Sequence, residues 1–247
     1  MEPTDANPGI SDRYQQVLER IRIAKEKFGR IDDRIRLVVV TKGHSTDAIR
    51  EVVAAGAVDL GENYVQEALP KLESLAMIQG LTWHMVGHVQ RRKAPLVAAN
   101  FTWVHSLDSL ALAQRFDRSA GEAGIRLSVL LEYNVSGEGS KYGWDATGVG
   151  DQSAIFREVE AILSLDNLEI RGLMTMAPYS SEPELSRPYF QALRSLSERL
   201  QGSFGEKYFR DLSMGMSQDF EIAIEEGATI LRIGEAIMGN RPQAGWR

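Results

Sequence analysis

Short apolar runs alternate with helix-patterned segments eight times along this chain, and this alternation limits its fold more than any other feature. The first run, RLVVVTKG at 36–43, holds four consecutive apolar residues, three of them β-branched. Such a run is typical of a strand buried on both faces, as in a parallel sheet. Further strands are expected at 58–60, 81–86, 102–106, 127–133, 168–174, 208–212 and 229–233.

The segments between these runs carry apolar residues at helical spacing. Ahead of the first strand, Tyr14, Val17, Ile21 and Phe28 lie on one helical face, and Gly29 ends the helix. Further helices are expected at 46–55, 65–75, 90–99, 110–116, 152–164, 188–200 and 220–226, with a short one after Gly234.

Strands that are separated by helices run parallel, with right-handed crossovers. Eight such units within 247 residues predict a single (β/α)8 TIM barrel with an extra N-terminal helix. A doubly wound open sheet is the alternative, because periodicity does not show whether a sheet closes. We expect one barrel domain over 11–247, after a flexible N-terminus at 1–10.

Composition narrows the function. The net charge of −6, with no run of basic residues, argues against nucleic acid as a partner. No apolar run is long enough for a membrane span or a signal peptide. The chain has no cysteine, which rules out a thiol nucleophile and fits a reducing, cytoplasmic setting. No metal site is expected, since His84 and His88, the one histidine pair at ligand spacing, straddle Gly87 at a strand end.

Two small-residue loops fall where barrels of this kind build phosphate sites, after the seventh and eighth strands. They read SMGMS at 213–217 and GEAIMG at 234–239. Glycine lets the backbone approach an anion closely, and a helix start offers free N–H groups. Each loop alone is also what an ordinary turn requires, but the two together predict a phosphate site.

A lysine and an arginine belong to the same strand ends. Lys42 ends the first strand and either points into the mouth of the barrel or simply returns to water. Arg232 lies among apolar residues of the eighth strand, so it needs a partner: either a carboxylate or, deeper than Gly234 on the same face, a ligand. An amine, a phosphate cradle and a deep polar group suit pyridoxal 5′-phosphate (PLP), which needs partners for its aldehyde, phosphate and ring nitrogen.

Seven motifs follow one another from the first expected strand to the eighth. They are VVVTK at 38–42, GENYVQE at 61–67, WHMVGHVQ at 83–90, SKYG at 140–143, RGLMTMAP at 171–178, LSMGMSQDFEIAI at 212–224 and RIGEAIMG at 232–239. With these motifs the chain resembles the pyridoxal phosphate homeostasis proteins of the YggS/PROSC type, which look like the barrel half of an alanine racemase without its second, β-rich domain.

The resemblance implies a cofactor site. Lys42 is implied to hold PLP as a covalent aldimine, and Arg232 to face the pyridine nitrogen. Ser217 and the backbone of Gly234 and Glu235 are implied to bind the phosphate. Glu235 stands where a hydroxyl residue is frequent in the family, so only its N–H is expected to contact the phosphate.

Further residues follow from the same resemblance. Asn63 is implied to line the ring near the aldimine, and His84 and Met85 on the third strand are expected to line the pocket. Arg91 and Arg92 stand where Ser-Asn is commoner, which leaves the role of that loop open.

A carrier is favoured over an enzyme. Arginine is always charged and only donates, so it leaves the ring nitrogen unprotonated and the ring a poorer electron sink. Racemisation needs acid/base groups on two faces of the substrate, and in racemases one comes from the second domain. Tyr64, Tyr133 and Tyr142 are possible substitutes, but each is better explained as a packed or rim aromatic.

We therefore expect a monomeric, non-catalytic protein of PLP (vitamin B6) homeostasis, with no catalytic residues and with apo PLP-dependent enzymes as recipients. The alternative is a PLP-dependent amino-acid racemase or another Schiff-base enzyme.

Overall fold

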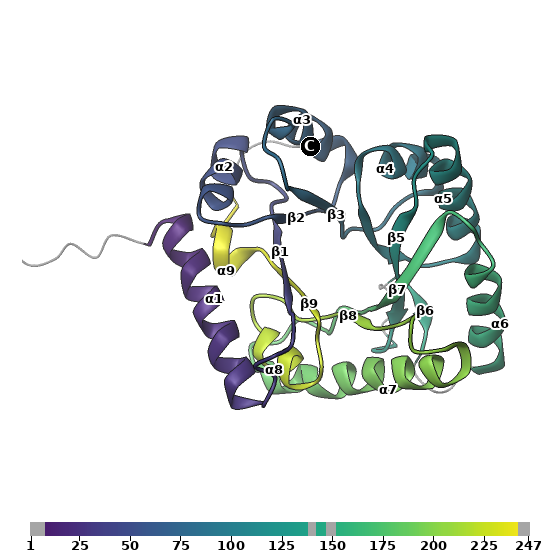
Figure 1. Cartoon of the computed structure of the whole chain (residues 1–247). Coiled ribbons are helices and arrows are strands. Elements are labelled where there is room, and N and C mark those ends of the chain that lie inside the picture. The colour runs from purple at the N-terminus through teal and green to yellow at the C-terminus, as the bar shows by residue number, and fades with distance from the viewer. Residues whose placement is uncertain (1–7, 138–141, 147–151, 242–247) are drawn as a thin grey trace, which may run out of the picture.

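Eight parallel strands close into a barrel in the computed structural model, which describes residues 8–137, 142–146 and 152–241 (Figure 1). Each barrel strand pairs with a neighbour on both sides, including β9 with β1 and β4 with β5, so the sheet closes on itself. The open-sheet alternative is therefore wrong and the (β/α)8 barrel is confirmed. The barrel strands are β1 (Arg36–Val40), β2 (Asp59–Glu62), β3 (Thr82–Met85), β4 (Trp103–Leu107), β5 (Leu127–Asn134), β7 (Leu168–Met174), β8 (Asp211–Ser213) and β9 (Ile230–Ile233). A two-residue strand, β6 (Trp144–Asp145), pairs with the end of β5.

Helices form the outer ring of the barrel. They are α2 (Thr46–Ala54), α3 (Val65–Leu75), η1 (Arg91–Lys93), α4 (Ala94–Asn100), α5 (Leu110–Ala123), α6 (Gln152–Leu163), η2 (Pro183–Ser186), α7 (Arg187–Phe204), α8 (Phe220–Glu225) and α9 (Glu235–Met238). The predicted extra helix, α1 (Ile10–Lys27), is confirmed, and it packs against α2, α8 and α9. Because α9 has only four residues, α1 covers the barrel wall beside it, and Arg13 Nε donates to Ile237 O at 2.7 Å.

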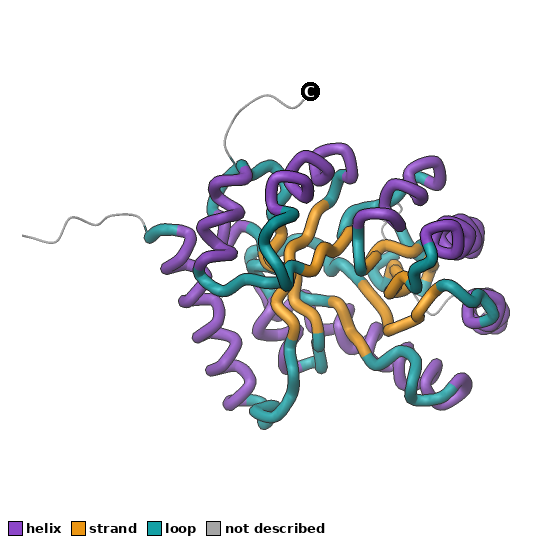
Figure 2. Tube along the Cα trace, turned by 45° about the horizontal axis from the view of Figure 1, so that its top comes forward, coloured by secondary structure: helices purple, strands orange, loops and turns teal. Residues whose placement is uncertain are grey.

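The core has two layers, since side chains alternate across each strand. Val39 faces the helices and belongs to the larger apolar layer between strands and helices. Val38 and Val40 face inward, into a smaller apolar cluster inside the barrel. Figure 2 shows the strands as an inner ring within the helices. Burial on both faces explains why the strands appear in the sequence as unbroken apolar runs.

The strand predicted at 208–212 lies later in the chain, at 211–213. Phe209 adopts a left-handed backbone conformation, with φ of 58°, which breaks the extended run. Ser213, expected in a loop, is therefore the last residue of β8, and its side chain is buried inside the barrel. Of the predicted flexible N-terminus, residues 1–7 lie outside the described part.

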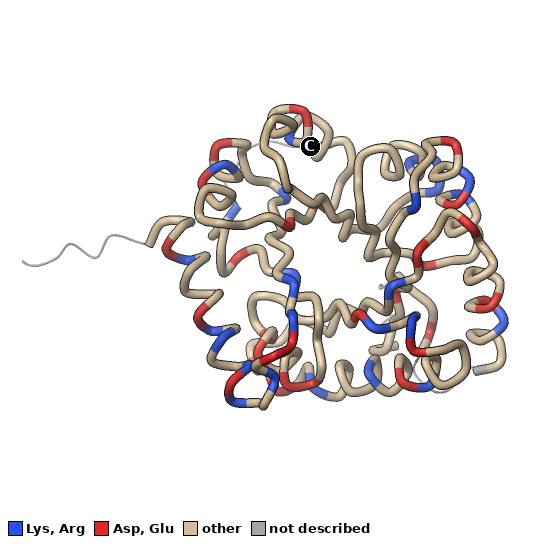
Figure 3. The backbone as a smooth tube through the Cα atoms, in the orientation of Figure 1, with Lys and Arg blue, Asp and Glu red and all other residues tan. Residues whose placement is uncertain are grey.

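Acidic and basic residues are interspersed along the outer helices (Figure 3). Within the described ranges, no helix is both long and apolar enough to cross a membrane. The same ranges contain no group of three or more His, Asp or Glu side chains suited to a metal ion. Ser140 and Lys141 of the SKYG motif lie outside the described residues.

Candidate functional site

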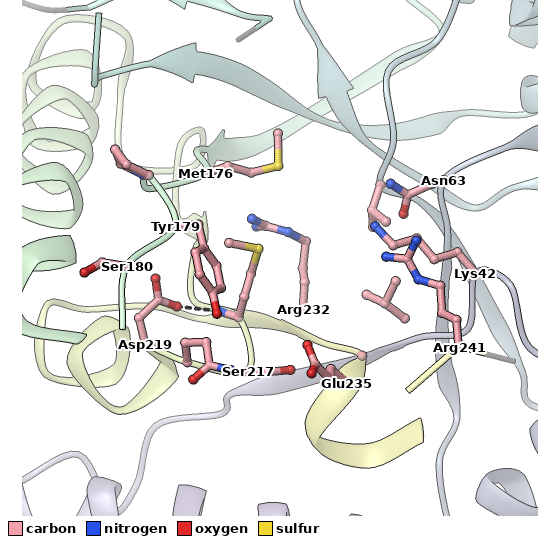
Figure 4. A pocket seen from close by; sticks show the side chains of 16 residues that line it. Lys42, Asn63, Met176, Tyr179, Ser180, Ser217, Asp219, Arg232, Glu235 and Arg241 are labelled. Carbon is pink, nitrogen blue, oxygen red and sulfur yellow. Dashed lines mark hydrogen bonds between the residues drawn. The ribbon is translucent and has the colours of Figure 1, made fainter. Parts of the chain in front are cut away.

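A cavity of about 310 Å³ opens at the carboxyl ends of β1, β2 and β9 (Figure 4). Its volume suits a small cofactor or substrate. The loops that follow β7 and β8 complete its wall. Among its lining residues are six that the sequence analysis named: Lys42, Asn63, Ser217, Arg232, Gly234 and Glu235.

The structure places His84 and Met85 away from this cavity. Met85 packs in the layer between strands and helices, because it lies on the outer face of β3. His84 is buried inside the barrel and forms hydrogen bonds there. The residue that reaches the cavity wall is Val86, which directly follows β3.

Lys42 lies at the mouth, directly after β1, and its side chain points into the cavity beside Asn63 and Arg241 (Figure 4). Burial, and next the charge of Arg241, lower the pKa of Lys42 below its usual value. No hydrogen bond or ion pair to its Nζ is formed by any described residue. A lysine in this state is more often neutral and therefore nucleophilic.

A buried ionic cluster fixes the peptides on both sides of Lys42. The Lys71 ammonium on α3 donates to Thr41 O at 2.9 Å, and Glu67 Oε1 accepts from Gly43 N at 2.5 Å. Lys71 and Glu67 also pair with each other at 2.6 Å, one helical turn apart. The cluster therefore holds the backbone that aims Lys42.

Glu62, the last residue of β2, is the third charged member of this cluster. Its Oε1 pairs with Lys71 at 2.7 Å and accepts from the Thr41 hydroxyl at 2.6 Å. Its Oε2 is buried without a hydrogen-bond partner, and burial raises the pKa of Glu62. The sequence analysis missed the cluster, although the GENYVQE motif contains both acids.

Arg232 lies at the floor of the cavity and is buried. Its two terminal nitrogens donate to Ser213 Oγ at 2.6 Å and to Thr175 O at 2.9 Å. Burial lowers the pKa of Arg232 to about 10, so it stays cationic at neutral pH. No described carboxylate forms an ion pair with it, which leaves its remaining N–H groups for a ligand.

The wall beside α9 combines a glycine turn with a serine hydroxyl. Gly234 precedes α9, and a Cβ there would lie 3.2 Å from Val40 O, so glycine suits this close packing. Ser217 Oγ accepts from Ala236 N at 3.1 Å, which places its hydroxyl beside the same turn. The Glu235 carboxylate points toward Ser217 (Figure 4).

Asn63 carries an unsatisfied polar atom at this site. Its Oδ1 is buried and has no hydrogen-bond partner. Buried polar atoms without partners are rare, so an orphan at a cavity wall fits a ligand that would pair with it. With the half-buried amine of Lys42 and the donors of Arg232, the site suits a flat, anionic aldehyde.

Other lining residues were missed by the sequence analysis. Met176 and Tyr179 come from the loop after β7, Met216 and Asp219 from the loop after β8, and Arg241 from the segment after α9. Met176, Met216 and Asp219 lie inside motifs that carry the family resemblance but were given no role, whereas Tyr179 and Arg241 lie outside every motif.

None of the three tyrosines considered as acid/base groups lines the cavity. Tyr64 is exposed, and Tyr133 is buried in the core, where burial raises its pKa. Tyr142 stacks on His88 at 3.7 Å between ring centroids, away from Lys42.

Comparison with known proteins places this site in a family context. The sequence profile described as "Alanine racemase, N-terminal domain" matches residues 13–242. The pyridoxal phosphate homeostasis protein of Aquifex aeolicus (strain VF5) is 40% identical over 230 residues, covering 93% of this chain and 97% of that protein. The protein of the same name from Escherichia coli (strain K12) is 35% identical over 238 residues, covering 94% and 97%.

Solved structures of similar fold include one relative of the same size and one larger, distant protein. PipY of Synechococcus elongatus PCC7942, 34% identical and covering 93% of this chain and all of that one, superposes with a TM-score of 0.82 without PLP and 0.80 with PLP bound. An alanine racemase of Clostridium difficile 630 matches with a TM-score of 0.72 at 15% identity, over 94% of this chain and 58% of that one. At that identity the likeness concerns the barrel fold alone.

Proposed function

The chain belongs to the pyridoxal phosphate homeostasis protein family and matches the alanine racemase N-terminal domain, and we propose that it binds PLP and takes part in PLP (vitamin B6) homeostasis. One observation carries the proposal: Lys42, Arg232 and Gly234 line a single cavity. An amine, a guanidinium and a glycine turn thus converge from strands that are neighbours in the barrel but distant in sequence.

Each residue has a role that its chemistry supports. The Lys42 amine, with its lowered pKa, holds the cofactor through a covalent Schiff base, and Arg232 donates to the ring nitrogen. Ser217 and the N–H groups of Gly234 and Glu235 hold the phosphate. When bound, PLP supplies an aldehyde carbon that reacts reversibly with amines.

We further propose that the protein is a monomeric carrier rather than an enzyme. Arg232 can only donate, so it disfavours a protonated ring nitrogen and the reactions that require one. Tyr64, Tyr133 and Tyr142, which were considered as a second acid/base group, lie outside the cavity, and Tyr179, which lines it, is largely exposed to solvent. The recipients would be apo PLP-dependent enzymes in the cytoplasm, a setting with which the lack of cysteine is compatible.

Titration of the purified chain with PLP tests the binding site. We expect a yellow protein whose absorption band moves on borohydride reduction, with the reduced adduct located on Lys42 by peptide mass spectrometry. Lys42→Ala should lose the band, while Lys207→Ala, at a lysine placed over the Tyr208 ring outside the cavity, should keep it. An unchanged spectrum in Lys42→Ala would contradict the assignment.

A second measurement separates carrier from enzyme. The PLP-loaded protein is incubated in deuterated water with single L-amino acids, and chirality and α-proton exchange are followed. We expect no turnover, together with transfer of PLP to an apo PLP-dependent enzyme. Turnover at ordinary enzyme rates, on the order of 1 per second or faster, would instead establish catalysis.

A further inference from the structure

A chain of side-chain hydrogen bonds crosses the inside of the barrel, from the floor of the cavity to the opposite mouth. Arg232 bonds to Ser213 Oγ at 2.6 Å, and Ser213 Oγ to His105 Nδ1 at 2.9 Å. His105 Nε2 meets His84 Nδ1 at 2.9 Å, and His84 Nε2 meets Asp59 Oδ1 at 2.9 Å. We call Ser213, His105, His84 and Asp59 the interior chain.

The acceptor end of this chain fixes the direction of every bond in it when both histidine rings are neutral. Asp59, as a carboxylate, can only accept, so His84 donates to it from Nε2 and must accept at Nδ1. His105 therefore carries its proton on Nε2, which it donates to His84 Nδ1, and its own Nδ1 accepts from the Ser213 O–H. Arg232 can only donate, and Ser213 Oγ accepts from it. With neutral rings, one arrangement of protons satisfies all four bonds.

The ionisation of each member agrees with this arrangement. Burial lowers the pKa of both His84 and His105, so both rings are neutral near pH 7 and each has one donor and one acceptor nitrogen. Burial alone would raise the pKa of Asp59, but the hydrogen bond from His84 and the charge of Arg36 bring it below its usual value. The terminal acceptor is therefore a carboxylate.

Arg232 needs such support. It is a buried cation with no described carboxylate in ion-pair contact, and only Ser213 Oγ and Thr175 O accept from it. A buried charge without compensation is costly. The aligned dipoles of the interior chain lead from Arg232 to Asp59, which is held at the far mouth by Arg36 at 2.7 Å.

We propose that the interior chain (Ser213, His105, His84 and Asp59) positions Arg232 for the PLP site. Its members act by fixing the orientation of the Arg232 guanidinium, and so the N–H groups that it offers to the ligand. The proposal rests on the proposed function, because its consequence is read on the bound cofactor. It gives His84 a role beneath the cavity rather than in its wall. It also gives a role to His105 and places Ser213, which was expected in the phosphate loop, beneath the cavity as well.

The first test needs no cofactor. Nitrogen-15 NMR of the histidine-labelled full chain at pH 7.5, with signals assigned through single-histidine variants, reports which ring nitrogen carries the proton. We expect Nε2–H alone on both His84 and His105. A proton on Nδ1 of either ring, or a doubly protonated ring, would overturn the direction of the chain.

The second test changes the end of the interior chain that lies farthest from the cavity. Asp59→Asn removes the terminal carboxylate at the mouth opposite the cavity, so it reaches PLP only through the interior chain. The matched control is Asp211→Asn, because Asp211 lies at the same mouth and pairs with Arg171 at 3.2 Å but does not join the chain. We expect Asp59→Asn to move the absorption maximum of bound PLP and to weaken binding severalfold, and Asp211→Asn to do neither.

The near end is tested in the same way. Ser213→Ala should shift the PLP band and weaken binding on the order of tenfold, since it leaves a hydrogen bond of a charged group unmade, and Ser213→Thr, which keeps the hydroxyl, should restore both. Ser197→Ala is the control, since that buried hydroxyl donates to Phe209 O at 2.6 Å outside the barrel interior.

Equal spectra and affinities for Asp59→Asn, Ser213→Ala and their controls would overturn the positioning role. If the wild-type chain fails to bind PLP, the proposed function fails, while the NMR result still decides whether the interior chain is oriented as stated.

Discussion

At the scale of single residues, Glu235 is a side chain of the site whose negative charge opposes the phosphate that we place beside it. It stands beside Gly234, and its carboxylate points toward Ser217, where we place the phosphate (Figure 4). Two like charges about 4 Å apart repel by about 1 kcal/mol in water, and by more where water is excluded. We therefore expect Glu235→Gln to bind PLP several times more tightly.

Glu235→Thr should tighten binding further, because a hydroxyl can donate to the phosphate. Dissociation constants from absorption titrations, repeated at high salt to screen the charge, measure both effects. Weaker binding in both variants would show that the carboxylate does not face the phosphate.

Arg241 sets the reactivity of Lys42. After burial, its charge is the largest cause of the lowered pKa of Lys42, and both side chains line the same cavity. Arg241→Gln should therefore raise the pKa of Lys42, so that the amine becomes neutral only at higher pH. The rate at which PLP reacts with the protein, measured against pH, should shift its midpoint upward.

A matched control for this shift is Arg210→Gln, at an exposed arginine that donates to Glu206 O far from the cavity. Its midpoint should equal that of the wild type. If Arg241→Gln also leaves the midpoint in place, the low pKa of Lys42 arises from burial and the charge of Arg232 without a contribution from Arg241.

Glu132 should make stability depend on pH. It is buried inside the barrel, its Oε2 has no hydrogen-bond partner, and burial raises its pKa from 4.5 to about 7. A raised carboxyl pKa gives stability that is present below the unfolded-state pKa and is lost as the pH rises through the folded-state pKa.

Between about pH 4.5 and about pH 7, the stability of Glu132→Gln should thus increase relative to wild type by about 3 kcal/mol. Urea denaturation at a series of pH values measures this difference, with Glu198→Gln, at an exposed position, as the control for losing one charge. A difference that does not vary with pH would mean that Glu132 is paired when folded.

The sequence predicts site residues whose position depends only on where a strand ends. It does not predict contacts between residues that are distant in sequence. Lys42 and Gly234 follow directly from where a strand stops and from alternation along it. Met85 and the cavity-lining Val86 differ by one position, which reverses the face of a strand. The bond between His105 and Ser213 joins residues 108 positions apart, and no local pattern contains that information.

At the scale of elements, the tightest junction near the site lies where β2 and β3 end side by side. A Cβ added to Gly87 would lie 2.4 Å from Asn63 O, closer than any real contact. Gly87→Ala must therefore displace the Asn63 backbone from its present position. Overpacking of this kind costs about 1–3 kcal/mol, so we expect a lower free energy of unfolding together with weaker PLP binding.

The matched control is another glycine-to-alanine change with open space around it. Gly202 lies in α7, and a Cβ there would meet nothing within 4 Å. Gly202→Ala should stabilise the protein by about 0.5–1 kcal/mol and leave PLP binding unchanged. If Gly87→Ala binds PLP as well as the control does, Asn63 is not needed at its present position.

The same element scale shows what periodicity does and does not predict. Long amphipathic segments such as α1 and α7 were placed to within a few residues, since their apolar faces repeat many times. The short β8 was misplaced, because a left-handed Phe209 is a tertiary outcome that neither hydrophobicity nor a glycine signals. Boundaries are thus least predictable where an element is short and a neighbour decides its conformation.

At the scale of the whole molecule, the site joins the first and last strands of the barrel. Its wall combines Lys42 after β1, Asn63 after β2 and Arg232 on β9 with the loops after β7 and β8, so it joins segments from both ends of the chain. α1 closes the outer ring over the short α9, directly behind the glycine turn that we assign to the phosphate. Opening the barrel at this seam would break the site.

A ligand that bridges these segments should therefore stabilise the whole fold. At a concentration of PLP one hundred times its dissociation constant, linkage predicts about 2.7 kcal/mol of added stability, or a rise in Tm of roughly 5–10 °C for a domain of this size. Lys42→Ala keeps the phosphate and ring contacts but not the covalent bond, so its Tm should rise less at the same concentration. Pyridoxal, which lacks the phosphate, should give a smaller rise in the wild type for the complementary reason. Scanning calorimetry measures the three rises in Tm. Equal rises with PLP in the wild type and in Lys42→Ala would show that the Lys42 amine does not contribute to the stabilisation by PLP.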